Sequence, residues 1–266
     1  MPEYVNLYAE RTDMDIATIG GLIIGVSAVV IAFLLEGGNL SMVVQLPAMI
    51  IVIVGTVGAA TITTSFENMM RLPKYLRIAM SKTQFDPHQL INDIVRLAER
   101  ARREGILGLE QNLRSIEPGF FRNAMQLVID GTEVTVLRET LESEMAYMTE
   151  RHKVGITLFK KLGGFSPTFG IIGTVLGLIH ALASTNDESK MASAIAVAFI
   201  ATLWGIALAN LFYLPVSDKL RHRHEEEMFK LQLVTEGVIA IQSGDNPRMI
   251  RSRLMSFLNS RPKKGL

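Results

Sequence analysis

The sequence contains no cysteine. This absence excludes disulfide bonds, thiolate metal sites and cysteine nucleophiles within the chain. An excess of charge of either sign is also lacking. The formal net charge is +1, so charge gives no indication of a nucleic-acid partner, and none is expected. The first fifteen residues carry four acids and only one base, Arg11, so they lack the basic start of a secretory signal peptide.

Asp, Glu, Lys and Arg are absent from four long apolar stretches, residues 16–35, 42–62, 162–183 and 191–214. Each holds about 20 residues, which at about 1.5 Å per residue cross a hydrocarbon core of about 30 Å. Buried helices of soluble proteins are usually shorter. We therefore predict an all-α, polytopic membrane protein with four transmembrane helices and a cytoplasmic helical domain.

The distribution of lysine and arginine predicts the orientation. Both are frequent in residues 63–160 and 215–266, whereas the connections 36–41 and 184–190 hold none and one. The positive-inside rule then places both large segments and both termini in the cytoplasm. The predicted segments are a cytoplasmic N-terminal segment (1–15), spans one and two (16–62), a cytoplasmic helical domain (63–160), spans three and four (161–214), and a cytoplasmic C-terminal helix with a basic tail (215–266).

The middle segment reads as helical. After residue 90, apolar residues recur every three to four positions, which is the period of one helix face. Asp86 and Pro87 before this run suit the N-cap and the first helical position. We predict a helix there that is interrupted near Gly105, and another from about Val134 that continues past Lys161 into the third span.

Small residues follow one face of each of the last two predicted spans. Such residues let helix backbones approach closely in a membrane. Two interpretations stay open: the two faces pack against each other within the chain, or part of each faces a partner helix or a pore. The residues are Gly170, Gly173 or Thr174, Gly177 and Ala181 in the third span, and Ala194, Ala198, Ala201 or Thr202, Gly205 and Ala209 in the fourth.

Two threonines and two prolines in these spans, together with the absence of a carboxylate, indicate how the spans could take part in ion conduction. Thr174 and Thr202 lie near mid-span, where a hydroxyl either bonds the carbonyl four residues earlier or offers an oxygen to a cation or a water. Pro167 and Pro215 lie near the cytoplasmic ends and make hinges possible. Proton and sodium pathways normally use an intramembrane carboxylate. Since the spans have none, a partner must supply the acid if this chain conducts cations.

The third span, residues 162–182 (LGGFSPTFGIIGTVLGLIHAL), resembles that of the MotA/PomA/MotP family, the A subunits of the flagellar motor stator. Residues 194–209, followed by Leu214 and Pro215, are similar to the family's fourth span. The wider superfamily includes the ExbB and TolQ energisers, which have a single span before the cytoplasmic segment. The paired first spans favour the flagellar branch, and an ExbB/TolQ-like energiser of an envelope transport or defence complex is the alternative.

The resemblance implies a homopentamer in the bacterial inner membrane, arranged around a dimer of a single-span, peptidoglycan-binding B subunit whose intramembrane aspartate binds the ion. Flow of Na⁺ or H⁺, with a slight preference for Na⁺, would drive the rotor switch protein FliG. Membrane lipid is the surrounding partner, and no cofactor or metal centre is implied. Thr174 and Thr202 resemble a polar pair of the family, and we expect Gly173 and Ala201 beside them in the ion pathway. Pro167 and Pro215 match the family's two prolines and are expected to be hinges, and the rotor contact is expected at Glu110 and at Arg102 or Arg103.

Two other classes of protein have little support. A stand-alone transporter usually has more spans and often an inverted repeat, and neither pattern is visible. An enzyme is not expected, because the sequence has no nucleophile–base arrangement, no glycine-rich phosphate loop and no metal-ligand spacing.

Overall fold

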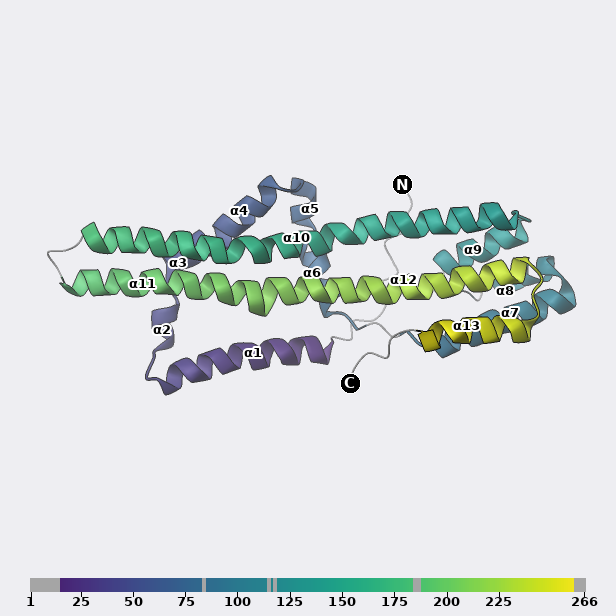
Figure 1. Ribbon diagram of the computed structural model, residues 1–266, viewed down its shortest axis with the longest axis horizontal. Coiled ribbons are helices and arrows are strands. Elements are labelled where there is room, and N and C mark those ends of the chain that lie inside the picture. Colours follow the sequence, from purple (N-terminus) through teal and green to yellow (C-terminus); the bar gives the residue numbers. More distant parts are fainter. Residues whose placement is uncertain (1–14, 83–84, 114–115, 117–118, 184–187, 261–266) are drawn as a thin grey trace. The chain divides into compact units, whose positions relative to one another are not determined.

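The computed structural model describes residues 15–82, 85–113, 116, 119–183 and 188–260. The regular elements in this part of the chain are all helices (Figure 1), which confirms the all-α prediction. The described residues divide into two compact units. We call residues 15–82 and 152–222 the membrane unit, and residues 85–151 and 223–260 the polar unit.

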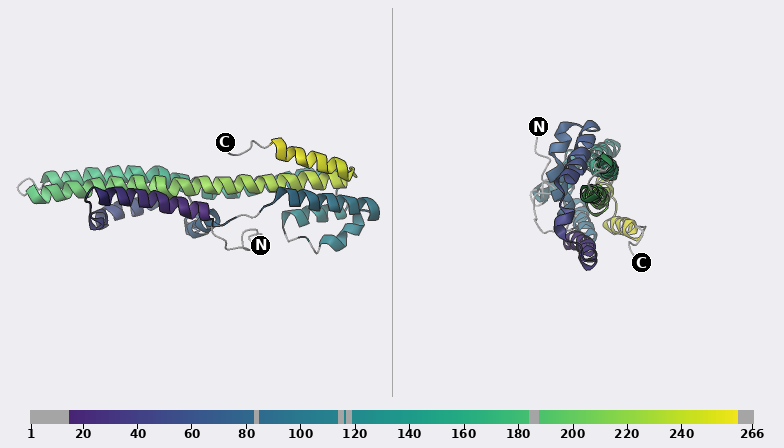
Figure 2. Two further views of the ribbon diagram at one scale, coloured as in Figure 1. Left: turned by 90° about the horizontal axis from the view of Figure 1, so that it is seen from below. Right: turned by 90° about the vertical axis from the view of Figure 1, so that its left-hand side faces the viewer.

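Long apolar helices dominate the membrane unit. Helix α1 (Ile16–Leu35) begins at Asp15, whose side chain accepts a hydrogen bond from the Ala17 amide. The last part of α10 (Val134–Ala183) runs beside α11 (Glu188–Ala207) in all views (Figures 1 and 2). Helix α11 continues through the π-helical segment η4 (Leu208–Tyr213) into α12 (Leu214–Gln242). Within the described residues, three helices are long and apolar enough to cross a membrane.

The second apolar stretch is shorter than predicted. A separate turn of helix, α2 (Leu40–Val43), precedes a continuous run of α3 (Leu46–Met49), η2 (Ile50–Val54) and α4 (Gly55–Ile62). The break lies at Val44 and Gln45, and Pro47 follows in the first turn of α3, where a helix tolerates proline. The continuous part, Leu46–Ile62, extends about 25 Å at about 1.5 Å per residue. The count of four transmembrane helices therefore stays a prediction.

Two short helices follow within the membrane unit and pack against its long helices. They are α5 (Phe66–Met70) and α6 (Leu72–Met80). Ala79 is fully buried in a cluster that includes Leu158 and Leu162 of α10 and Val216 of α12. The segment after the second apolar helix is thus held by the same helices that form the spans.

The polar unit begins with α7 (Pro87–Glu104), whose predicted N-cap is confirmed because the Asp86 carboxylate accepts a hydrogen bond from the His88 amide at 2.9 Å. The chain continues through η3 (Ile106–Leu109), α8 (Glu110–Leu113) and α9 (Phe120–Ile129). The first part of α10, the last part of α12 and α13 (Pro247–Ser260) complete the unit. Helix α10 is continuous from Val134, as the sequence predicts. The core includes Ile94, Leu137, Leu233 and Ile250.

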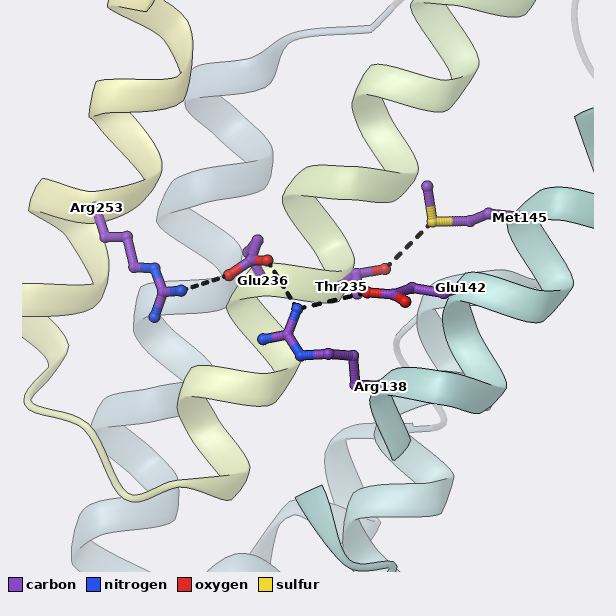
Figure 3. Close-up of polar contacts among 6 residues, drawn as sticks. All are labelled: Arg138, Glu142, Met145, Thr235, Glu236 and Arg253. Atoms are coloured by element: carbon purple, nitrogen blue, oxygen red, sulfur yellow. Dashed lines mark hydrogen bonds and ion pairs between the residues drawn. The ribbon is translucent and has the colours of Figure 1, made fainter. Parts of the chain in front are cut away.

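One carboxylate joins three helices of the polar unit (Figure 3). Glu236 on α12 accepts hydrogen bonds from Arg138 of α10 at 3.2 Å and from Arg253 of α13 at 2.7 Å. Its side chain is 17% exposed, whereas the arginines are 39% and 50% exposed. Arg138 also lies 3.6 Å from Glu142, a longer and more exposed pair. Glu236 is therefore the shared acceptor at this junction.

We predict that Glu236→Gln lowers the stability of the chain by about 1 kcal/mol, because two partly exposed arginines lose their charged acceptor together. Thermal unfolding of the detergent-solubilised chain measures the change. Glu142→Gln is the matched control on α10 and should have an effect of about 0.5 kcal/mol or less. Equal effects of the two substitutions would contradict the role assigned to Glu236.

Candidate functional site

Helices α10 and α11 touch backbone to backbone. A Cβ atom added at Gly205 would lie 2.8 Å from the carbonyl oxygen of Ser166 and 2.9 Å from Cα of Gly170. The buried Ser166 hydroxyl donates a hydrogen bond to the carbonyl of Gly205 at 2.9 Å. Because both neighbours are main-chain atoms, there is no flexible side chain that can move aside. The first interpretation of the small-residue faces, packing within the chain, therefore applies to these positions.

Two residues predicted for the ion pathway lie in this same contact. A Cβ at Gly173 would come 2.6 Å from Cβ of Ala201, and both residues are buried. One turn further along α10, Gly177 lies against Ala198 in the same way. The structure thus brings Gly173 and Ala201 together, and their part in ion conduction stays a prediction.

The two threonines also meet. The Thr174 hydroxyl lies in hydrogen-bond contact with the Thr202 hydroxyl, 3.0 Å from the carbonyl of Ala198 and 3.1 Å from that of Gly170. Thr202 Oγ1 is 3.5 Å from the carbonyl of Gly170. Two hydroxyls supply only two hydrogens, so the four converging oxygens keep unused lone pairs. Both threonines are half-buried. The contact with Gly170 is the bond to the carbonyl four residues earlier that the sequence left open, and the arrangement as a whole is a cluster of neutral oxygens.

The two prolines lie in different helical settings. Pro167 is inside α10, and the helix is continuous through it. Pro215 is the second residue of α12, and one residue, Leu214, separates it from the π-helical segment η4. Proline removes the hydrogen bond to the carbonyl four residues earlier, and a local π-helix is one way to accommodate that loss. Their action as hinges stays a prediction.

The predicted rotor-contact residues lie where α7 ends. Gly105 stops the helix with φ 80° and ψ 167°, a conformation that suits glycine, and η3 follows. Arg102, Arg103 and Glu110 are all exposed. The neighbouring Arg100 forms an ion pair with Glu104 at 3.6 Å. Within the described residues, Arg102 and Arg103 have no ion-pair partner.

Helix α13 adds residues to this region that the sequence did not indicate. It packs against α7, and an open groove of about 420 Å³ is lined by Arg102 and Arg103 of α7 and by Arg248 of α13. The remaining lining residues are Glu99, Asn246 and Pro247. The Asn246 side chain accepts a hydrogen bond from the Arg248 amide at 3.0 Å, which fixes the start of α13. Arg248 lies far from Arg102 in the sequence, so no local pattern signals their proximity.

A second missed residue is Trp204, the only tryptophan. Its indole N–H donates a hydrogen bond to the carbonyl of Val43 at 2.9 Å. This bond joins α11 to the residue that ends α2. In the described ranges, no group of three His, Asp or Glu side chains could hold a metal ion.

The sequence matches two protein-family models and several known relatives. Residues 112–233 match the MotA/TolQ/ExbB proton channel family, and residues 19–105 match the motility protein A N-terminal family. Motility protein A of Borreliella burgdorferi is 36% identical, over 95% of this chain and 97% of its own length. Chemotaxis protein PomA of Vibrio alginolyticus is 35% identical, over 92% and 96%. The chain belongs to the MotA/TolQ/ExbB proton channel family. Within it, this protein is an A-type subunit of the flagellar motor stator, and the energiser alternative is not supported.

Solved stator structures have the same fold. The C. jejuni MotAB structure matches this A subunit with a TM-score of 0.87 at 29% identity, over 95% of this chain and 99% of that one. The flagellar MotAB stator complex of Bacillus subtilis matches with a TM-score of 0.87 at 29% identity, over 92% and 96%. The apolar helices and these relatives indicate a protein of the bacterial inner membrane.

We predict that Gly205→Ala separates α10 from α11 and destabilises the subunit by about 1–3 kcal/mol, because the methyl group has only backbone to displace. Thermal unfolding in detergent measures the loss. Gly164→Ala is the control on α10, since a Cβ there meets nothing within 4 Å. The control should be neutral or stabilising, and a neutral Gly205→Ala would contradict the packing described above.

Proposed function

We propose that this stator subunit forms a homopentamer around a dimer of a single-span, peptidoglycan-binding B subunit, and that cations cross the membrane between the two. One observation carries the proposal: the oxygen cluster at Thr174 and Thr202 lies in spans without a carboxylate. A cation that leaves water needs replacement oxygens, which hydroxyls and carbonyls can provide. It also needs a negative charge nearby, and the aspartate of the B subunit would supply it.

The transported ion is Na⁺ or H⁺, and the converging neutral oxygens favour Na⁺ in this proposal. A proton needs a titratable group along its route, whereas a sodium ion needs several oxygen ligands. Gly173 and Ala201, in contact beside the threonines, would keep the helix backbones close enough for their carbonyls to take part. No enzymatic step is involved, because ion flow alone would drive the motor.

The exposed charges of the polar unit would contact the rotor switch protein FliG. Arg102, Arg103 and Glu110 are exposed, and the two arginines have no ion-pair partner within the described residues. Charges of this kind favour fast, oriented association with a surface of complementary charge. Pro167 and Pro215 would serve as hinges that transmit the effect of ion binding along α10 and α12. The distribution of lysine and arginine supports an orientation in which both termini and the polar unit face the cytoplasm.

The ion pathway is tested by Thr174→Val, which removes one hydroxyl while keeping the shape of the side chain. We expect cells lacking the native gene and carrying this variant to swim at half the normal speed or slower, because the cluster loses an oxygen. Swimming speed is measured with the sodium gradient intact and then collapsed at constant proton-motive force. Thr168→Val is the control, since that hydroxyl bonds only the carbonyl of Gly164 at 3.2 Å on an exposed face. Normal swimming of the Thr174→Val strain would contradict the assignment.

The rotor contact is tested at the residue that only the structure revealed. We predict that Arg248→Glu and Arg102→Glu each reduce torque severalfold, because both change the charge of one groove. Torque is measured on tethered cells. Arg251→Glu, an exposed arginine on α13 that does not line the groove, is the control and should retain most of the torque. Equal losses at Arg248 and Arg251 would indicate a general charge effect instead.

A further inference from the structure

A basic strip lies immediately after the second apolar helix. Residues 63–82 contain four bases and a single acid, Glu67. Arg71, Lys74, Arg77 and Lys82 are all exposed. Arg71 forms an ion pair with Glu67, but within the described residues Lys74, Arg77 and Lys82 have no ion-pair partner. We call these four residues the basic strip. It carries positive charge that the protein itself does not neutralise.

Helix α6 and its N-cap, Arg71, hold three of the four strip residues on the outer side of the helix. Arg71, Lys74 and Arg77 are three residues apart, so they cover roughly a third of the helix circumference. The opposite side is buried in the membrane unit, and Tyr75 there lies where a Cβ of Gly155 would clash. The inner residues are Leu72, Tyr75, Leu76, Ile78 and Ala79. Helix α6 is thus anchored by one face and presents cations on the other.

The contacts of α6 fix its level along α10. It packs on Leu158, Phe159 and Leu162, which is where the charged part of α10 changes to the apolar part at Lys160 and Lys161. In Figure 1 α6 runs across the direction of α10 and not along it. This is the orientation expected of an amphipathic helix that lies in the plane of a membrane surface.

Large apolar side chains next to the strip point outward. Ile62, at the end of α4, is 88% exposed, and Phe66 and Met70 of α5 are 71% and 68% exposed. Phe66 and Met70 are four residues apart and therefore share a helix face. Exposed apolar groups directly beside unneutralised cations are the pattern of a surface that enters the boundary between lipid headgroups and acyl chains.

We propose that the basic strip binds the headgroups of anionic phospholipids in the cytoplasmic leaflet, with Phe66 and Met70 inserted at the acyl boundary. The proposal rests on the orientation proposed above, in which residues 63–82 face the cytoplasm. The charge favours anionic lipid over a zwitterionic one, since each cation near an anionic surface strengthens binding about fivefold. The attached lipids would hold α6, and through it the middle of α10 and the start of α12, at a fixed depth.

The test uses the purified complex of the full chain with its B-type partner. Native mass spectrometry counts the phosphatidylglycerol and phosphatidylcholine molecules retained from an equimolar mixture. The wild type should prefer phosphatidylglycerol, and the preference should fall with added salt. Lys74→Glu with Arg77→Glu should reduce the preference at least fivefold. The neutral pair Lys74→Gln with Arg77→Gln should reduce it less, and serves as the test if the reversed pair fails to fold.

Arg102→Glu with Arg103→Glu is the matched control, because it reverses two exposed arginines in the polar unit. It should abolish swimming while leaving lipid preference unchanged, so the motor function and the lipid site can fail independently. An unchanged preference in both strip variants overturns the proposal. So does a strip variant that changes the number of subunits but not the lipids retained, because the strip would then be a contact between copies of the chain.

Discussion

The close approach of α10 and α11 at Gly170 and Gly205 is the contact on which the membrane unit depends. Lipid supplies little hydrophobic force to join two apolar helices, so association relies on packing and on hydrogen bonds between them. Here glycine removes the side chains that would hold the backbones apart, and Ser166 adds a buried hydrogen bond to the carbonyl of Gly205. A change at one of these positions therefore affects the geometry of the whole pair.

The same contact determines the polar chemistry. The hydroxyl of Thr174 bonds the carbonyl of Gly170 on its own helix, and it also reaches the carbonyl of Ala198 across the close helix pair. Hydroxyls facing lipid would bond only within their own helix, whereas these two meet each other. The close packing of α10 against α11 and the hydrogen bonds of the two threonines therefore depend on the same contact. The two interpretations of the small-residue faces do not exclude each other, because the residues that pack also bring the oxygens together.

Local patterns predicted the parts of the fold that depend on near neighbours in the sequence. The N-cap at Asp86 and the unbroken helix from Val134 follow from capping chemistry and periodicity, and both are present. The break at Val44 and Gln45 was missed because the predicted span rested on the apolar run alone. The proximity of Arg248 to Arg102, and the packing of α6 against α10, depend on tertiary contacts between distant residues. No local pattern carries that information.

Both units have little negative charge at the sites that the proposed function uses, and one explanation accounts for both. The spans contain no carboxylate although they bring four oxygens together, and the polar unit leaves Arg102 and Arg103 exposed beside a groove with only one acid, Glu99. Under the proposed function each deficit is made up by a different partner: an aspartate of the B subunit in the membrane, and a surface of complementary charge on the rotor. The missing negative charge in this chain is then what makes ion binding and torque depend on assembly.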